Sequence, residues 1–290
     1  LTAQNFTTAT DTYNTAVGYA AGAAVTTGLY NTLIGGSVGD AITSGDHNTA
    51  MGYNALGANT VGDRTVAIGS GALRLQNPAT NADMYNTAVG YDAGQAVTTG
   101  TLNTLIGALA GDALTTGAYS VAVGYAALST EDTADNNTAI GYAALSTLNG
   151  GTQNTALGQS AAAAMTTGDQ NTIIGTNAGD ALTDSDYNVA IGINALGADT
   201  MGSRSVAIGR HALATQNFTT ATESHNVAIG YSAGMSSTTG NENTFVGYSS
   251  GAAVTTGTNN TLIGSLAGDA ILTGVSNVAV GYLALSLEDE

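Results

Sequence analysis

The chain has 290 residues, of which 40 are glycine, one is proline and only 9% are charged. Its net charge of −17, from 21 acidic residues against four arginines, excludes the basic surface that nucleic acids or anionic membranes require. A hydrophobic share of 43% argues against disorder, and the absence of cysteine excludes a disulfide scaffold or a cysteine zinc site.

A short motif recurs along the chain, beginning with Asn-Thr-Ala-Val-Gly at 14–18. Its closing glycine falls at 18, 35, 52, 69, 90, 107, 124, 141, 158, 175, 192, 209, 230, 247, 264 and 281. Thirteen of the fifteen intervals are 17 residues and two are 21, and the two long ones begin at Gly69 and Gly209. Because the opening residues resemble 213–226, we expect long coils at 1–18, 70–90 and 210–230. The spacing predicts one continuous repeat domain over 1–290 with a 140-residue superrepeat.

Each repeat holds two apolar runs of four or five residues, separated by corners that contain glycine, as in 86–102. Such runs are too short for helices, and the recurring glycines would interrupt them. We therefore expect two short strands and two turns per coil. The fold class predicted is all-β: a parallel β-solenoid of about sixteen 17-residue coils.

Two adjacent columns of the repeat are apolar. The residue before the closing glycine is a branched aliphatic or Met in all sixteen copies, and the residue before that is Ala in eleven. Neighbouring strand residues point to opposite faces, so both faces of this strand are apolar. One face lines the interior, and we expect further copies of the chain to cover the other. This predicts a homo-oligomer with cyclic symmetry.

A column of asparagines stands four positions before the glycine. We expect these side chains to form a hydrogen-bonded ladder along the solenoid axis, and Thr65, Ser120 and Ser205 replace asparagine in the other three copies. The ladder residues are Asn14, Asn31, Asn48, Asn86, Asn103, Asn137, Asn154, Asn171, Asn188, Asn226, Asn243, Asn260 and Asn277.

Tyrosine follows the closing glycine in eight copies. These rings suit either of two roles: stacking on glycans, or forming a seam between chains. The eight are Tyr19, Tyr53, Tyr91, Tyr125, Tyr142, Tyr231, Tyr248 and Tyr282.

The strings TVAIG at 65–69, SVAVG at 120–124 and SVAIG at 205–209 resemble the heads of YadA-type trimeric autotransporter adhesins. That resemblance implies a left-handed β-roll assembled as a homotrimer. The family's usual coil is shorter, and NTAIGYAALST at 137–147 is more similar to repeats of phage tail-fibre-like and bacterial surface proteins. The resemblance therefore implies an extracellular fibre segment, a shaft or head that attaches to a cell-surface glycan or protein receptor.

We find no catalytic, cofactor-binding or metal-binding constellation in the sequence, so we expect a protein that is not an enzyme. The histidines His47, His211 and His225 fall in different coils. Four aspartates share a corner column four or more coils apart, where they suit turn stabilisation: Asp40, Asp112, Asp180 and Asp269. The acidic clusters at 131–135 and 288–290 could bind calcium weakly, but we favour this interpretation less than a solvent-exposed acidic surface.

Two other functions remain open. A self-assembling extracellular filament with end-to-end contacts is the main alternative, since the chain begins and ends within a coil. The repeated Thr-Thr-Gly, as at 26–28 and 98–100, is also compatible with ice binding. Interruptions of that column at 60–61 and 130–133 favour a structural role for the threonines.

Overall fold

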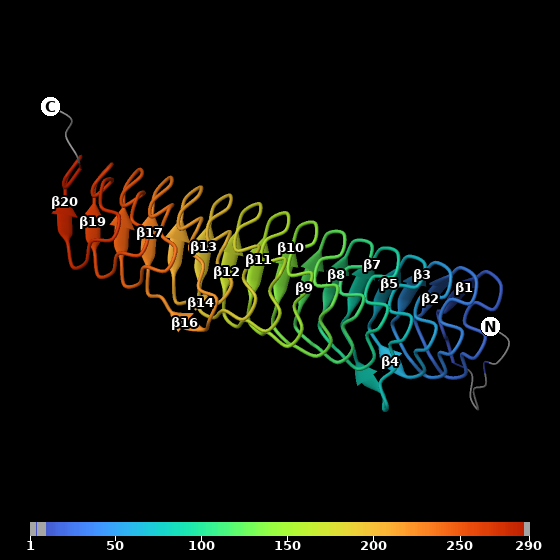
Figure 1. Cartoon of the computed structure of the whole chain (residues 1–290). Coiled ribbons are helices and arrows are strands. Elements are labelled where there is room, and N and C mark those ends of the chain that lie inside the picture. Colours follow the sequence, from blue (N-terminus) through green and yellow to red (C-terminus); the bar gives the residue numbers. More distant parts are fainter. Residues whose placement is uncertain (1–3, 5–9, 287–290) are drawn as a thin grey trace. The chain divides into compact units, whose positions relative to one another are not determined.

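The computed structural model describes residue 4 and residues 10–286 (Figure 1). The chain divides into two compact units, Leu1–Tyr142 and Ala143–Glu290. Both are all-β, and neither contains a helix within the described residues. Eight of the eighteen residues of the long coil predicted at 1–18 lie outside the described residues.

Each unit has eight three-residue strands, one per coil, and one pair of two-residue strands among its described residues. In unit 1 these are β1 (Thr15–Val17), β2 (Thr32–Ile34), β3 (Thr49–Met51), β5 (Val66–Ile68), β7 (Thr87–Val89), β8 (Thr104–Ile106), β9 (Val121–Val123) and β10 (Thr138–Ile140), with the pair β4 (Gly62–Asp63) and β6 (Ala82–Asp83). In unit 2 they are β11 (Thr155–Leu157), β12 (Thr172–Ile174), β13 (Val189–Ile191), β15 (Val206–Ile208), β17 (Val227–Ile229), β18 (Thr244–Val246), β19 (Thr261–Ile263) and β20 (Val278–Val280), with the pair β14 (Gly202–Ser203) and β16 (Thr222–Glu223).

Within each unit, consecutive three-residue strands pair in parallel and in register. Thr15 pairs with Thr32 of the next coil, and Val66 pairs with Thr87 across the long coil of unit 1. The pairs β4–β6 and β14–β16 are also parallel, and each joins a long coil to the coil before it. These pairings confirm a parallel β-solenoid of about sixteen coils, and Figure 1 shows the strands of each unit side by side.

The prediction of two strands per coil is wrong, because the second apolar run forms turns. Its residues repeatedly adopt left-handed backbone conformations, for example Asn54 with φ 56° and Leu56 with φ 54°. These turns still bond to the next coil: the N–H of Leu56 donates to the carbonyl of Ala72 over 3.0 Å. Left-handed residues reverse the chain within a few positions, so that each short circuit can close.

The interior is filled by side chains of complementary size. The central residue of each strand faces inward, and Leu33, Ala50 and Leu105 are fully buried. Where this residue is large, glycine stands six positions later: a Cβ on Gly111 would lie 2.7 Å from Cδ2 of Leu105. In six of the eleven coils where it is alanine, as at Ala50, a buried leucine stands there instead, as at Leu56. Eleven of the sixteen coils therefore supply one large side chain to this part of the interior.

The closing glycines are required by the close approach of successive coils. Gly107 has φ +131°, and a Cβ there would lie only 2.4 Å from the carbonyl oxygen of Gly124 in the next coil. Any side chain would push the coils apart at this corner.

Candidate functional site

The asparagine column forms a continuous chain of hydrogen bonds inside each unit. Nδ2 of Asn103 donates to the carbonyl of Gly117 over 2.9 Å, and Oδ1 of Asn103 accepts from the backbone N–H of Ser120 over 2.9 Å. Asn103 is fully buried, as are most ladder residues. Each side chain thus satisfies one carbonyl and one N–H that the turns leave without a partner.

The ladder crosses the long coils through a glutamine that the sequence interpretation missed. At the long coil of unit 1, where Thr65 replaces asparagine, Nε2 of Gln76 donates to Oγ1 of Thr65 over 2.8 Å. Oε1 of Gln76 accepts from Nδ2 of Asn86 over 2.9 Å. In unit 2, Oε1 of Gln216 accepts from Nδ2 of Asn226 over 2.8 Å. The available signal was a polar residue in a column that holds Val, Leu or Ile in eight of its sixteen copies.

Asp199 lies beside Gln216 in the interior of unit 2 and is fully buried. Its carboxylate accepts from Nε2 of Gln216 over 2.6 Å and from the backbone N–H groups of Gly202 and Phe218. Burial nevertheless raises the pKa of Asp199, because desolvation of the charged form outweighs these hydrogen bonds. The equivalent position of unit 1, one superrepeat earlier, holds the neutral Asn59.

The eight tyrosines of the predicted column are all exposed, from 44% for Tyr231 to 87% for Tyr19. Where two follow each other in adjacent coils, the rings stack. The Tyr125 and Tyr142 centroids are 5.7 Å apart, and the Tyr231 and Tyr248 centroids are 5.6 Å apart, both with interplanar angles of 12°. These columns offer flat aromatic faces to solvent or to another chain.

A second column of planar side chains stands directly before the ladder asparagine, and the sequence interpretation also missed it. These residues have left-handed backbone conformations, such as Tyr30 with φ 58°. The Tyr30 ring stacks on Tyr13 at 5.4 Å and on His47 at 4.7 Å. Ordinary preferences disfavour such residues in this conformation, so sequence alone gave no signal.

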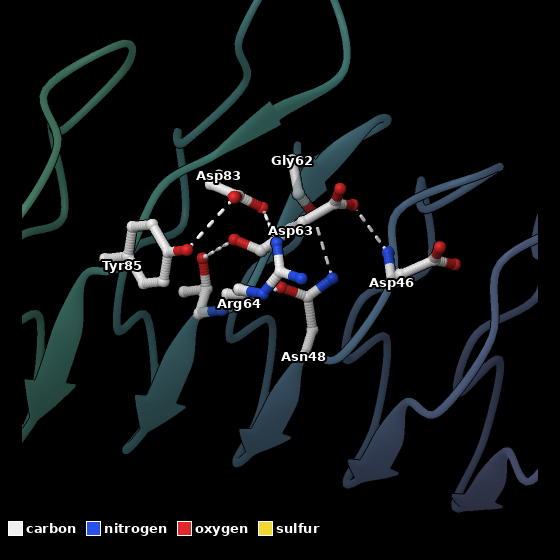
Figure 2. Close-up of polar contacts among 8 residues, drawn as sticks. Asp46, Asn48, Gly62, Asp63, Arg64, Asp83 and Tyr85 are labelled. Carbon is white, nitrogen blue, oxygen red and sulfur yellow. Dashed lines mark hydrogen bonds and ion pairs between the residues drawn. The ribbon is translucent and has the colours of Figure 1, made fainter.

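At the long coil of unit 1, this second column carries a charged cluster (Figure 2). The Arg64 guanidinium forms an ion pair with Asp83, whose other oxygen accepts from the Tyr85 hydroxyl over 3.0 Å. The guanidinium also lies 5.8 Å from the Tyr85 ring centroid. Next to Arg64 in the chain, Oδ1 of Asp63 accepts from the backbone N–H of Asp46 over 2.7 Å, and burial raises the pKa of Asp63.

Unit 2 has a similar cluster in which two of the residues differ from those of unit 1. Arg204 pairs with Glu223 at 3.0 Å and lies 4.8 Å from the ring centroid of Tyr187, in the preceding coil. His225 stands where unit 1 has Tyr85, with Nε2 3.8 Å from Glu223. Both ion pairs are largely exposed, so they contribute little stability.

The remaining candidate polar residues do not assemble into a catalytic or metal site. Asp112 and Asp180 lie in partly buried corners, and this burial raises the pKa of both carboxyl groups. Among the described residues, no group of three or more His, Asp or Glu could hold a metal ion. The same part of the chain has no helix able to cross a membrane. The terminal acidic cluster at 288–290 lies outside the described residues.

The threonines of the Thr-Thr-Gly corners are used inside the solenoid. Oγ1 of Thr26 donates to the carbonyl of Thr43 over 3.1 Å, and Oγ1 of Thr98 donates to the carbonyl of Thr115 over 3.1 Å. The first threonine of each of these pairs therefore bonds the next coil, which favours a structural role over ice binding.

The residue before each closing glycine lies on the outer face of the strand. Val17, Met51 and Ile106 in unit 1 are 57%, 43% and 39% exposed, and Leu157 and Ile263 in unit 2 are 43% and 38% exposed. The three-residue strands of both units contain no charged residue. On a chain with net charge −17, each unit thus presents an uncharged sheet face, on which these aliphatic side chains run beside a column of threonine and valine. No family model matches the chain, and no curated protein matches it significantly.

Proposed function

We propose that the chain is a structural and adhesive segment of an extracellular attachment fibre, in which three copies pack their outer strand faces together. It would serve as the shaft or head of a tail fibre or of a surface adhesin. The observation that supports this proposal best is the row of exposed aliphatic side chains along the strands. A row of apolar groups one coil apart is costly to leave in water, and other copies of the same chain offer an identical uncharged face.

The rest of the molecule suits a structural role. The ladder side chains of the interior bond to one another or to backbone, and the aromatic and charged columns lie outside. Extracellular attachment itself follows from the resemblance to adhesin-head and tail-fibre repeats. The exposed tyrosines then provide surfaces for a receptor or for the seam between copies.

The test is a charge placed on the proposed interface. We expect sedimentation equilibrium to give the mass of three chains for the wild type and of one chain for Ile106→Glu, because the carboxylate would be desolvated beside its symmetry mates. Leu102→Glu is the matched control: Leu102 is 44% exposed but lies in the turn two residues before the strand rather than on its outer face, so this variant should remain trimeric. A monomeric wild type would contradict the proposal. Assemblies that grow without limit with concentration would contradict a closed trimer and favour the filament.

A further inference from the structure

A hollow on the outer surface of unit 1 lies between two rings of the tyrosine column. Tyr53 and Tyr91 stand two coils apart, and the coil between them carries Ser70 in place of tyrosine. The small side chain leaves a space of about 210 Å³, with the two rings as walls and Ser70 and Gly71 between them. We call this space the tyrosine slot.

The width of the slot follows from the stacked tyrosines elsewhere in the column. Rings in adjacent coils are 5.6 and 5.7 Å apart, so two rings that project in the same way from coils two apart would be separated by about 11 Å. A six-membered ring placed midway would lie about 5.5 Å from each wall, within the range of stacked rings. The slot therefore has room for one ring.

The polar groups of the slot select the chemistry of that ring. Asn54, Arg74, Asp92 and Gln95 line it and offer amide, guanidinium and carboxylate groups. Among the described residues, the buried Nε of Arg74 has no hydrogen-bond partner. The carboxylate of Asp92 accepts from the hydroxyl of Tyr91 and raises the pKa of that tyrosine. A ligand rich in hydroxyls would use these groups, whereas an aromatic ligand would leave them without partners.

The charges near the slot favour a neutral sugar over an acidic one. Arg74 and Asp92 bring one positive and one negative group to the slot, and the chain as a whole carries −17. A carboxylated sugar would be repelled at long range without an unopposed cation to hold it. We propose that the tyrosine slot binds one neutral hexose residue of a glycan, held between Tyr53 and Tyr91. The proposal supplies a ligand for the attachment role proposed above, but it is tested independently of that role.

In unit 2 a larger side chain occupies the position that corresponds to Ser70. There, one superrepeat later, Arg210 replaces Ser70 and Ile193 replaces Tyr53. The Arg210 guanidinium lies 5.7 Å from the Tyr231 ring centroid, and its NH1 donates to the Tyr231 hydroxyl over 3.3 Å. The backbone thus accepts an arginine at this position, and that arginine covers the tyrosine face.

These internal differences supply variants that should fold. Ser70→Arg copies unit 2 and should close the slot, and Tyr53→Ile removes one wall in the same way. Tyr19→Ile is the matched control, since Tyr19 belongs to the same column but does not line the slot. Saturation-transfer NMR on the intact chain would use the methyl glycosides of glucose, galactose, mannose and N-acetylglucosamine, with the methyl glycoside of N-acetylneuraminic acid as the acidic probe.

We expect saturation transfer to at least one neutral glycoside and weaker or absent transfer to the N-acetylneuraminic acid glycoside. Titration should show at least a tenfold loss of affinity in Ser70→Arg and Tyr53→Ile but not in Tyr19→Ile. The proposal is overturned if no neutral glycoside binds, if the N-acetylneuraminic acid glycoside binds best, or if Ser70→Arg binds like the wild type. Sedimentation of the same samples separates the two proposals. A trimer without sugar binding refutes the slot alone, and a sugar-binding monomer refutes the trimer alone.

Discussion

Exchanging the sizes of Leu105 and Gly111 tests how the interior of the solenoid is packed. Leu105 is fully buried, so Leu105→Ala should lower the free energy of unfolding by about 3 kcal/mol through lost burial and a cavity. Gly111→Leu should cost about 2 kcal/mol, because its Cβ alone would lie 2.7 Å from Leu105. The double variant recreates the pair Ala122 and Leu128 found one coil later, where Leu128 is buried with φ 54°.

We expect the double variant to lose only about 2 kcal/mol, chiefly the cost of a leucine in the left-handed region and of imperfect fit. The two changes would then be coupled by about 3 kcal/mol. Urea unfolding followed by tyrosine fluorescence at one fixed protein concentration measures the cycle. Hydrogen exchange of the Gly111 amide, which donates to Ala127, reports on the same coil locally. Additive losses, with coupling below about 0.5 kcal/mol, would refute the size-complementarity argument.

Two further predictions concern buried polar groups. Asn103→Ala should lower the free energy of unfolding by about 4 kcal/mol, because the Ser120 N–H and the Gly117 carbonyl both lose their partner. Asn103→Ser should lower the free energy of unfolding by less. Equal losses of the two variants in urea unfolding would contradict this prediction. Burial raises the pKa of Asp199, so the ionised carboxylate destabilises the folded protein. This destabilisation is absent below the pKa of the unfolded chain, near 3.8, and grows as the pH rises through the pKa of the folded protein. The stability of Asp199→Asn relative to wild type should therefore increase from pH 4 to pH 7 in thermal unfolding, and a pH-independent difference would contradict the assignment.

The fold could be predicted largely because its main constraints repeat. A glycine at the same point of every coil marks the corner where a side chain would strike the next coil, as at Gly107. The adjacent apolar columns also indicated a strand with one inner and one outer face. Which face is inner could not be predicted, because alanine and isoleucine suit either one. The structure places the alanine column, such as Ala122, inside.

The errors have a common physical cause in left-handed backbone. The second apolar run has the composition of a strand, but Leu56 and Leu128 adopt φ 54°, which a β-strand excludes. Leucine has no intrinsic preference for the left-handed region, so the geometry of the coil imposes this conformation. Burial of the leucine side chain offsets its cost. The planar column before the ladder was missed for the same reason. The tyrosine slot was missed because it arises from an interruption, Ser70, in a column that was read only for its tyrosines.

The internal duplication shows which outer positions of the fold accept different side chains. At and beside the long coils, the interior residues Ala67 and Leu73 recur unchanged in the next superrepeat, although the buried Asn59 and Met84 become Asp199 and Ser224. Outer residues at the same coils differ in size and charge: Ser70 becomes arginine, and Arg74 becomes alanine. Strand register is nonetheless the same in both units, with β5 pairing β7 and β15 pairing β17 across the long coils. The backbone therefore tolerates large changes on its outer columns, and a loss of binding on substitution there reports on the surface rather than on folding.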